Sequence, residues 1–379
     1  MPKAIILSGG WGTRLRPLTC TIPKTLIPIC NKPVMERQIL LLKAAGVTEI
    51  VLAVSVMADV IKDYFKEGEK LGIKISYTDE IFPAGTAGAI KLAEDILKDD
   101  NFFMLNGDVI LNFDFSRMLQ FHIKSKAFGT IASKIIEDPS HYGVIIANQN
   151  TNKIEKFLEK EEYKPPTGGF VPMPINSGVY LLEPEILSYI PSNKKVSIER
   201  EVFPKITEER EVYHYPIEGI WKDIGKPYDL LQGNISLMND LIQNLSEEHK
   251  SLVDYSAQIN PTSKIIHPCV IGEKTIIRQN CIIGPNAIIG DNVFIDDNCV
   301  LKNSIIYNES YISNNVEIEN AIISDNCAIG DNAHLKGIED KLILLSSYVK
   351  VMKGVKIIND FNDYYSVCHH EVVSESLKK

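Results

Sequence analysis

The sequence contains no run of 18 consecutive apolar residues, which excludes a membrane-spanning helix of ordinary length. It also lacks an excess of positive charge, because 40 Lys and Arg residues stand against 49 Asp and Glu residues, for a formal net charge of −9. Nucleic-acid-binding proteins need a basic surface, so general binding to DNA or RNA is not expected. A secretory leader is not expected either, because Pro2 and Lys3 lead directly into a strand-like run. We therefore expect a cytoplasmic protein.

The chain has the length and composition of a soluble globular protein with more than one domain. Its 379 residues are 45% hydrophobic and 23% charged, which predicts two or three domains. In a reducing compartment its seven cysteines are expected to remain thiols.

The first 130 residues alternate between strand-like and helix-like segments. Buried-strand runs cover 4–8, 49–55 and 102–109, and helical stretches separate them. This alternation predicts a parallel sheet with helices on both faces. Ligands of such sheets bind beyond the carboxyl ends of the strands, where a glycine-rich loop and the segment Asn-Gly-Asp-Val (106–109) both lie.

Residues 130–225 contain short strands, which we interpret as an extension that closes over the edge of the sheet. A helix capped by Ser197 is predicted over 197–206. Residues 228–258 begin with a helical pattern and continue as a polar stretch, which is typical of a connector.

The C-terminal region follows a six-residue period. Its phase residues are Ile259, Ile265, Ile271, Ile277, Ile283, Ile289, Ile295 and Leu301. This period is neither helical nor a plain alternation, and it matches a parallel β-helix whose coils have three sides of about six residues. The phase slips by one near residue 306 and resumes at Ile312, so we expect a bulge or a short loop there.

The same period accounts for four of the cysteines. Cys269, Cys281, Cys299 and Cys327 each lie four places after a phase residue. That position requires a small side chain facing the interior of the coil, so these cysteines are expected to pack in the core rather than to bind a metal.

The loop after the first strand combines glycines with cations. These residues are Gly9, Gly10, Gly12, Arg14, Arg16 and Lys24. Glycines let backbone N–H groups approach a polyphosphate closely. No Gly-Lys-Ser/Thr follows, which excludes a Walker loop, and the third glycine of the dinucleotide fingerprint is also missing. Most glycine pairs after strands are simple turns, so the loop alone does not define a function.

The longer string GGWGTRLRPLT…IPK resembles the signature of the sugar-1-phosphate nucleotidyltransferases. Further motifs follow in the order of that family: PAGTAGAI (83–90), YGV (142–144), FLEK (157–160), INSGVYLL (175–182) and WKDIG (221–225). SIEREVFPKI and GIWKDIGKPYDLL, followed by hexapeptide repeats, are most similar to the mannose-1-phosphate guanylyltransferase branch, of the catalytic type. The resemblance covers roughly residues 3–335.

The resemblance implies an α/β fold with a Rossmann-like mixed sheet, followed by a left-handed parallel β-helix. The expected domains are a catalytic domain over 1–235, a helical connector over 236–258, a β-helix over 259–360 and a flexible tail over 361–379. Cys368, His369 and His370 fall in that tail. Because a β-helix has flat faces and open ends, we expect a homo-oligomer formed through this domain, with a homologous regulatory subunit as a further partner.

The implied reaction joins GTP and mannose 1-phosphate to give GDP-mannose and pyrophosphate. The attacking phosphate oxygen is already anionic, so the chemistry needs charge neutralisation and in-line alignment rather than a general base. The resemblance assigns Arg14, Lys24 and Asp108 to catalysis. It assigns the nucleotide to Leu7, Gly9, Gly10, Gly12, Thr13, Arg14, Gly85, Thr86 and Gly88, where the alternative is a plain turn with a helix cap at Thr86.

Asp108 and Asp223 are the candidate ligands of Mg²⁺, which prefers hard oxygen donors and keeps waters and phosphate oxygens as its other ligands. The sugar phosphate is assigned to Gly143, Glu159, Lys160 and Asn176. Two departures from the family pattern occur: IPKTL replaces Pro-Lys-Pro-Leu, and EKEEYKPPTGG lacks the proline after Glu-Lys. The second departure lies in the loop expected to bind the sugar, so the sequence does not determine which sugar is used.

Several alternatives remain. The chain could use another NTP with glucose or glucosamine 1-phosphate, act as a regulatory subunit that binds GDP-mannose, or carry a C-terminal acetyltransferase. No motif singles out His267 or His334 as an acetyltransferase base. Trp11 is expected to pack under the loop. Arg16 either contacts phosphate or forms a structural ion pair.

Overall fold

The computed structural model describes residues 2–80, 84–166, 169–243, 250–359 and 363–378. The chain divides into two compact units. The first, here called the sheet unit, contains residues 1–10 and 35–221, and the second, the β-helix unit, contains residues 11–34 and 222–379. The cation-bearing loop therefore belongs to the same compact unit as the C-terminal repeats, which the pattern of the sequence does not predict.

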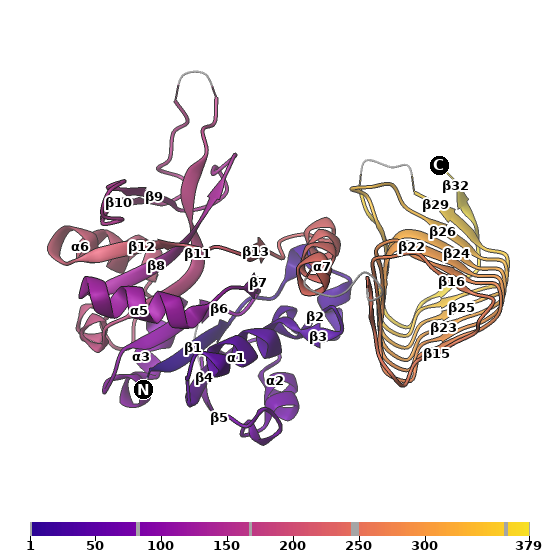
Figure 1. Cartoon of the computed structure of the whole chain (residues 1–379), viewed down its shortest axis with the longest axis horizontal. Helices are drawn as coiled ribbons and strands as arrows, with labels where there is room; N and C mark the ends of the chain where they lie inside the picture. The colour runs from indigo at the N-terminus through magenta and orange to yellow at the C-terminus, as the bar shows by residue number, and fades with distance from the viewer. Residues whose placement is uncertain (1, 81–83, 167–168, 244–249, 360–362, 379) are drawn as a thin grey trace. The chain divides into compact units, whose positions relative to one another are not determined.

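A nine-stranded mixed sheet forms the centre of the sheet unit (Figure 1). Its parallel part has the order β6-β1-β4-β5, with β1 at Lys3–Ser8, β4 at Glu49–Val54, β5 at Lys74–Asp79 and β6 at Phe102–Asn106. The order places β1 beside β6, so the loops after these two strands leave the same edge of the sheet. The predicted α/β fold is confirmed.

The extension predicted for residues 130–225 supplies the other five strands of this sheet, in a mixture of antiparallel and parallel pairs. These strands are β8 (Gly129–Ile136), β9 (Val144–Ala147), β10 (Ile154–Leu158), β11 (Met173–Leu182) and β12 (Val212–Pro216). Strand β11 pairs antiparallel with β6, β8 and β9, so this region continues the sheet through β11. A separate two-stranded sheet joins β7 (Val109–Asn112) to β13 (Ile220–Asp223), whose first two residues belong to the sheet unit.

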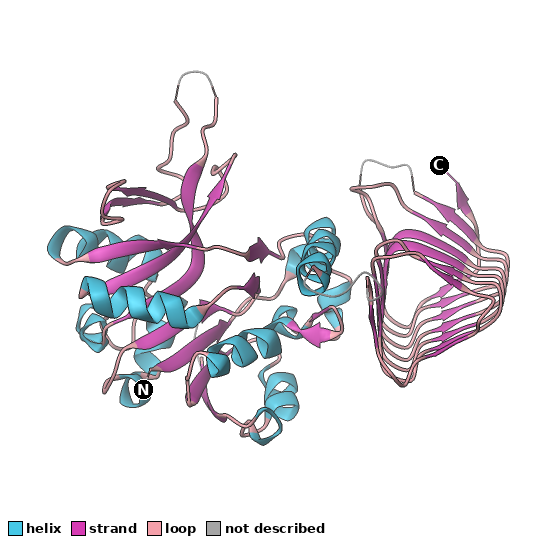
Figure 2. Ribbon diagram, in the orientation of Figure 1, coloured by secondary structure: helices cyan, strands magenta, loops and turns pink. Residues whose placement is uncertain are grey.

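Helices connect the strands of the sheet unit (Figure 2). They are α1 (Val34–Ala44), α2 (Ala58–Phe65), α3 (Gly85–Leu92), α4 (Glu94–Leu97), α5 (Phe115–Ser125) and α6 (Phe203–Glu209). Ser197 caps a π-helical turn at Ile198–Val202 that leads into α6, because its hydroxyl accepts a hydrogen bond from the Arg200 N–H, so the predicted cap is confirmed. The core includes Phe102, Phe103 and Tyr180, which are fully buried.

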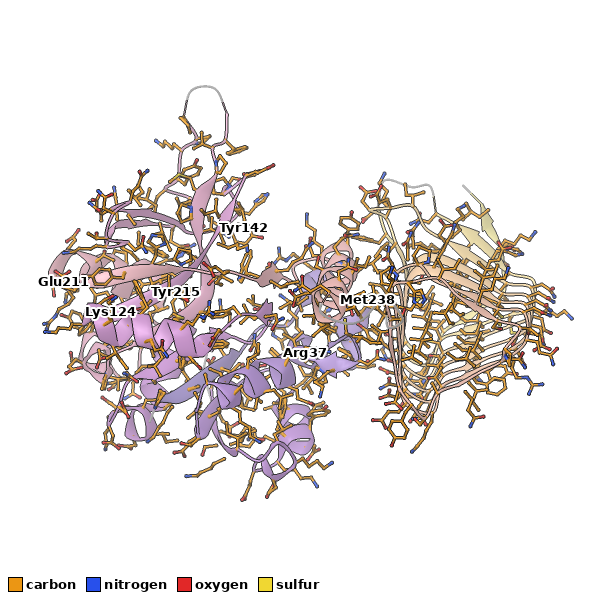
Figure 3. The ribbon with its side chains drawn as sticks, viewed as in Figure 1. Arg37, Lys124, Tyr142, Glu211, Tyr215 and Met238 are labelled. Atoms are coloured by element: carbon orange, nitrogen blue, oxygen red, sulfur yellow. The ribbon has the colours of Figure 1, made fainter. Side chains whose placement is uncertain are left out.

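The β-helix unit begins with the loop and with α7 (Pro227–Ile242), on which Met238 is buried (Figure 3). Short parallel strands follow, stacked in register as coils. One sheet contains β15 (Gln258–Ile259), β18 (Ile276–Ile277), β21 (Phe294–Ile295), β23 (Tyr311–Ile312), β25 (Ala328–Ile329), β28 (Lys350–Val351) and β31 (Val372–Val373). The other contains β14 (Leu252–Val253), β16 (Lys264–Ile265), β17 (Cys269–Ile271), β19 (Ile282–Ile283), β20 (Ala287–Ile289), β22 (Val300–Ile306), β24 (Glu317–Ile323), β26 (His334–Lys336), β27 (Ile343–Leu345), β29 (Lys356–Ile358), β30 (Tyr365–Val367) and β32 (Leu377–Lys378).

The phase slip near residue 306 is a shorter corner rather than a bulge or a loop. Ile283 pairs with Leu301 and Ala287 with Ser304, so Lys302 and Asn303 form the corner that three residues form in the preceding coil. Asn303 has a φ of +45°, a left-handed conformation that asparagine tolerates. Strand β22 consequently runs through the corner without interruption.

The interior of the coils contains the predicted residues. The phase residues from Ile271 to Leu301 and from Ile312 to Ile329 are at most 1% exposed, as are the four cysteines. Each of these thiols donates to a backbone carbonyl, as Cys281 does to Asp296 at 2.9 Å and Cys299 to Ser313 at 3.0 Å. The interpretation of the cysteines as core residues is confirmed.

The C-terminal residues do not form the expected flexible tail. Strands β30, β31 and β32 pair with β27, β28 and β29, so the coils continue to residue 378. His370 stacks on Tyr348 with 4.7 Å between ring centroids. The connector also differs from the prediction, because α7 begins at Pro227 and the first strand of the coils lies at Leu252–Val253.

Candidate active site

The loop after β1 is shaped by Gly12. This residue has a φ of +58°, and its carbonyl accepts hydrogen bonds from the Leu15 N–H and the Thr19 hydroxyl, both at 2.9 Å. A Cβ at Gly12 would lie 3.0 Å from the Thr19 methyl group and 3.2 Å from Lys24 Cβ. Any larger residue would therefore be strained and would push against the segment that carries Lys24.

The three cations of this loop differ in exposure. Arg14 and Arg16 are exposed, and neither has a carboxylate within 4 Å among the described residues. Lys24 is only 8% exposed, and its Nζ lies 3.7 Å from Asp223 Oδ1. Of the two interpretations of Arg16, a structural ion pair is thus not supported. An exposed guanidinium with no carboxylate partner is a suitable ligand for phosphate oxygens.

Two carboxylates and Arg14 surround Gly225. A Cβ at Gly225 would lie 3.1 Å from Asp223 Oδ2, 3.4 Å from Asp229 Oδ2 and 3.6 Å from an Arg14 terminal nitrogen. Asp229 lies in the first turn of α7 and was not predicted as a site residue. Its only sequence signal is its position six residues after Asp223 in WKDIGKPYD. Burial lowers the pKa of Lys222 below its ordinary value, and the Asp229 carboxylate opposes this shift.

The other predicted residues of the first loop lie as follows. Gly9 and Gly10 are exposed with open space around them, and Thr13 begins a 3₁₀ turn. The Leu7 carbonyl accepts a hydrogen bond from the Gly107 N–H at 2.9 Å. Trp11 is 65% exposed, so the expectation that it packs under the loop is wrong.

Asp108 lies in the turn between β6 and β7, which Gln38 supports from α1. The Gln38 side-chain amide donates to the carbonyls of Asn106 and Val109, each at 2.9 Å, one on either side of Asp108. Gln38 is 1% exposed and was missed by the sequence analysis. The available signal was a polar residue among the buried apolar residues of this helix, beside Met35 and Ile39.

The segment proposed to contact the base forms the start of α3. The Gly88 N–H and the Ala87 N–H both donate to the Val196 carbonyl, and a Cβ at Gly85 would lie 2.5 Å from that oxygen. Thr86 does not cap the helix, whose N-cap is Ala84. Its hydroxyl donates to Glu199 at 2.7 Å and accepts from the Ile198 N–H at 2.9 Å. Residues 81–83 lie outside the described residues.

Three of the predicted sugar-phosphate residues lie together. The Gly143 carbonyl accepts from the Asn176 N–H at 2.8 Å, and a Cβ at Gly143 would lie 3.3 Å from Glu159 Oε1. The Asn176 side-chain amide donates to the Tyr180 hydroxyl at 2.9 Å. Lys160 is exposed.

Glu159 has a polar environment that the sequence analysis did not identify. Burial raises the pKa of Glu159 above its ordinary value, and the Glu199 carboxylate adds to the rise, whereas Arg200 opposes it. Arg200 Nε lies 3.9 Å from Glu159 Oε2. Both Glu199 and Arg200 come from the motif at 197–206, from which the sequence predicted a capped helix and the family resemblance but no site residue. Nearby, the Tyr142 ring (labelled in Figure 3) packs edge-on against Trp221, whose indole N–H donates to the Ser177 carbonyl at 2.7 Å.

The candidate metal ligands belong to different units, Asp108 to the sheet unit and Asp223 to the β-helix unit. Among the described residues no group of three or more His, Cys, Asp or Glu side chains could hold a metal ion. Two carboxylates would suit a hard cation that takes its remaining ligands from substrate and water. His267 bonds to the Ser251 hydroxyl and His334 to Glu317, both near the surface. Within the described ranges no helix is long and apolar enough to cross a membrane.

Comparison with known proteins identifies both parts of the chain. The family model described as Nucleotidyl transferase matches residues 3–240, and the model described as GMPPB C-terminal domain matches residues 265–379. The Mannose-1-phosphate guanyltransferase 2 of Candida glabrata is 43% identical over 272 residues, which is 69% of this chain and 72% of the relative. The Xenopus tropicalis Mannose-1-phosphate guanylyltransferase catalytic subunit beta is 40% identical over 276 residues, 70% and 74% of the two chains.

Solved structures agree with this assignment. HddC from Yersinia pseudotuberculosis, also solved in complex with GMP-PN, is similar with a TM-score of 0.53 and 28% identity, covering 62% of this chain and 100% of HddC. A putative glucose-1-phosphate thymidylyltransferase from Bacillus anthracis is similar with a TM-score of 0.55 and 25% identity, covering 65% and 97%. From its sequence match, its mixed sheet and its loop of glycines and cations, this chain belongs to the nucleotidyl transferase family.

Proposed function

We propose that the protein transfers a guanylyl group from GTP to mannose 1-phosphate, giving GDP-mannose and pyrophosphate. The main support is a sequence identity of 40–43% to relatives named for this reaction, over about 70% of the chain. The cation-bearing loop supports it, because Arg14 and Arg16 are exposed without a carboxylate within 4 Å among the described residues. We also propose a cytoplasmic location.

In this proposal Arg14 and Lys24, with Arg16 beside them, bind the phosphates of the nucleotide. The incoming nucleophile is an oxygen of mannose 1-phosphate that is already ionised, and pyrophosphate leaves carrying the electron pair of the broken P–O bond. No proton needs to be removed, so the cations act by screening repulsion between the two substrates and by keeping them in line. The backbone at Leu7, Gly9, Gly10 and Thr13 and the start of α3 are proposed to complete the nucleotide site.

Glu159 and Lys160 are proposed to bind the sugar phosphate together with Gly143 and Asn176. The lysine would pair with the phosphate, and the glutamate carboxylate would accept a hydrogen bond from a sugar hydroxyl. Their support is local: the backbone bond between Gly143 and Asn176 and the short approach of Gly143 to Glu159.

Asp108 and Asp223 would hold Mg²⁺, whose donor set of carboxylate oxygens fits this cation. When bound, the cation supplies positive charge that stabilises the charge developing on the phosphate oxygens. Asp223 also lies 3.7 Å from Lys24 Nζ, so the same carboxylate would help to orient that lysine.

The test is pyrophosphate release measured over a matrix of GTP, ATP, UTP and dTTP against mannose, glucose and glucosamine 1-phosphates, with and without Mg²⁺. We expect release with GTP and mannose 1-phosphate and its loss after chelation. A preference for dTTP and glucose 1-phosphate would instead support the activity in the name of the Bacillus anthracis structure. No release with any pair would favour a regulatory role, and consumption of acetyl-CoA with an amino-sugar phosphate would favour a C-terminal acetyltransferase.

We further propose that the protein forms a homo-oligomer through the β-helix and that a homologous regulatory subunit is a second partner. The support is the set of open coil ends and flat sheet faces of the β-helix unit, which commonly assemble with other chains.

A further inference from the structure

One outer face of the β-helix is buried within its own unit. Along β17, β20, β22, β24 and β27 the side chains alternate between interior and exterior, as in any strand. The exterior residues are Val270, Ile288, Ile305, Ile322 and Leu344, and none is more than 5% exposed. An apolar outer face of this length is buried only if other segments of the protein pack against it.

Helix α7 and the cation-bearing loop both contact this face. The Tyr307 hydroxyl, at the end of β22, donates to the Pro28 carbonyl at 3.0 Å. The Ser346 hydroxyl, directly after β27, donates to the Pro17 carbonyl at 2.9 Å. Tyr307 is 3% exposed and Ser346 is fully buried, so the hydrogen bond of Ser346 is buried and that of Tyr307, to the half-buried Pro28, is partly buried.

The loop has little backbone pairing of its own. It consists of three short 3₁₀ turns and the two-residue strands β2 (Pro28–Ile29) and β3 (Lys32–Pro33). A buried carbonyl without a partner is costly, and Tyr307 supplies the donor for Pro28. Ser346 adds a second donor to the Pro17 carbonyl, which also accepts from the Cys20 N–H at 3.1 Å. Thr21 and Ser347, with their hydroxyl oxygens 3.2 Å apart, add a further contact between the loop and the coils.

The two carbonyls lie on either side of Lys24 along the chain, and the first comes just after Arg14 and Arg16. Pro17 directly follows Arg16, and Pro28 comes four residues after Lys24. We propose that Tyr307 and Ser346 are positioning residues that hold the phosphate-binding loop in its working conformation, so that the β-helix contributes to nucleotide binding. This inference rests on the proposed function. Loss of either anchor would let the loop sample more conformations, and the nucleotide would have to restore the ordered one on binding.

The kinetic test uses Tyr307→Phe and Ser346→Ala, singly and together. The matched controls are Tyr311→Phe and Ser313→Ala, which alter the same residue types elsewhere on the coils. We expect KM for GTP to rise about 5- to 30-fold in the double variant, the range for losing one or two hydrogen bonds, with KM for mannose 1-phosphate unchanged. Equal increases of both KM values, or a KM for GTP equal to that of the controls, would overturn the proposal.

A second readout needs no substrate. Trypsin cleaves after Arg14 and Lys24, and the rate at these two bonds reports how often the loop opens. We expect faster cleavage in the anchor variants than in the controls, and slower cleavage of the wild type when inorganic tripolyphosphate is added. If the double variant does not fold, the single variants decide the question. Unchanged cleavage contradicts the anchoring, whereas a wild type without guanylyltransferase activity contradicts only the proposed function.

Discussion

Lys24 and Arg14 illustrate how one loop presents two kinds of cation. Lys24 is 8% exposed and faces Asp223, whereas Arg14 is exposed beside the space left by Gly225. A buried lysine loses its solvent and depends on a nearby carboxylate, so it is fixed in position before substrate arrives. An exposed arginine can instead reorient toward phosphate oxygens. Both residues were identified from the sequence, but this difference between them follows only from the structure.

Asp108 provides a direct test at the residue scale. We expect Asp108→Asn to lower kcat by roughly 10²–10³, because the neutral amide cannot supply the charge that a cation ligand needs. The measurement is pyrophosphate release at saturating GTP and mannose 1-phosphate over a titration of Mg²⁺. Asp99→Asn, an exposed change near the start of β6, is the matched control. Full turnover of Asp108→Asn would remove Asp108 from the mechanism.

The raised pKa of Glu159 predicts a pH dependence. Burial and Glu199 favour the protonated form, so Glu159 takes up its proton at a higher pH than the ordinary value of about 4.3. Protonation removes part of its capacity to accept a sugar hydroxyl. We therefore expect KM for mannose 1-phosphate to rise as the pH is lowered from neutral toward the raised pKa of Glu159, at a higher pH than an ordinary glutamate would require.

The control for this prediction is Glu159→Gln, whose side chain cannot titrate. Because the phosphate of the substrate ionises equally with both proteins, the difference between their two pH profiles reports Glu159 alone. A raised carboxyl pKa in the folded state favours folding at low pH, and that contribution is lost as the pH rises. The glutamine variant should therefore be at least as stable as the wild type at neutral pH. If both proteins show the same pH profile, Glu159 does not bind the sugar as proposed.

At the scale of elements, helix α1 supports the turn that carries Asp108. Gln38 donates to the carbonyls on both sides of that turn, and its own side-chain oxygen has no hydrogen-bond partner among the described residues. This arrangement uses a buried polar group for the position of a loop rather than for stability alone.

We expect Gln38→Leu to lower the free energy of unfolding by about 1–3 kcal/mol, because two buried carbonyls lose their donor. The turn should also become mobile, so kcat should fall while the rate of trypsin cleavage after Arg14 and Lys24 stays unchanged. Chemical denaturation and steady-state kinetics measure both effects. Gln120→Leu, at an exposed position on α5, is the control. Wild-type kcat in a destabilised Gln38→Leu protein would show that the role of Gln38 is structural only.

At the scale of the whole molecule, the β-helix unit presents an outer face with an apolar row. Ile276, Phe294, Tyr311 and Ala328 lie in register on successive strands, and the rings of Phe294 and Tyr311 stack with 5.3 Å between centroids. Rows of this kind on a flat sheet favour self-association.

We expect a homo-oligomer at micromolar concentration in sedimentation, and we expect Phe294→Lys to weaken association by about tenfold or more, because it places a charge in an apolar contact. Lys264→Glu, on the other sheet of the coils, is the control. A wild-type monomer would contradict the proposed oligomer. An oligomer unaffected by Phe294→Lys would place the interface on another surface.

Several features of this protein could be read from the sequence because they depend on local order. The six-residue period defined the β-helix and the burial of Cys269 and its equivalents, since each coil repeats the same backbone path. The glycines and cations after the first strand, with the motifs that follow, indicated the family and most candidate site residues. These signals are local, because a strand end or a repeat corner needs particular residues within a few positions.

Other features were decided only by the tertiary structure. The exposure of Trp11, the shorter corner at Asn303, the coils formed by the last residues, the hydrogen bonds of Gln38 and Tyr307, and the position of Asp229 beside Gly225 were not predicted. The physical reason is that a hydrogen bond between Tyr307 and Pro28 joins residues far apart in the chain. Such partners leave no periodic pattern, so only the folded chain determines which buried carbonyl meets which donor.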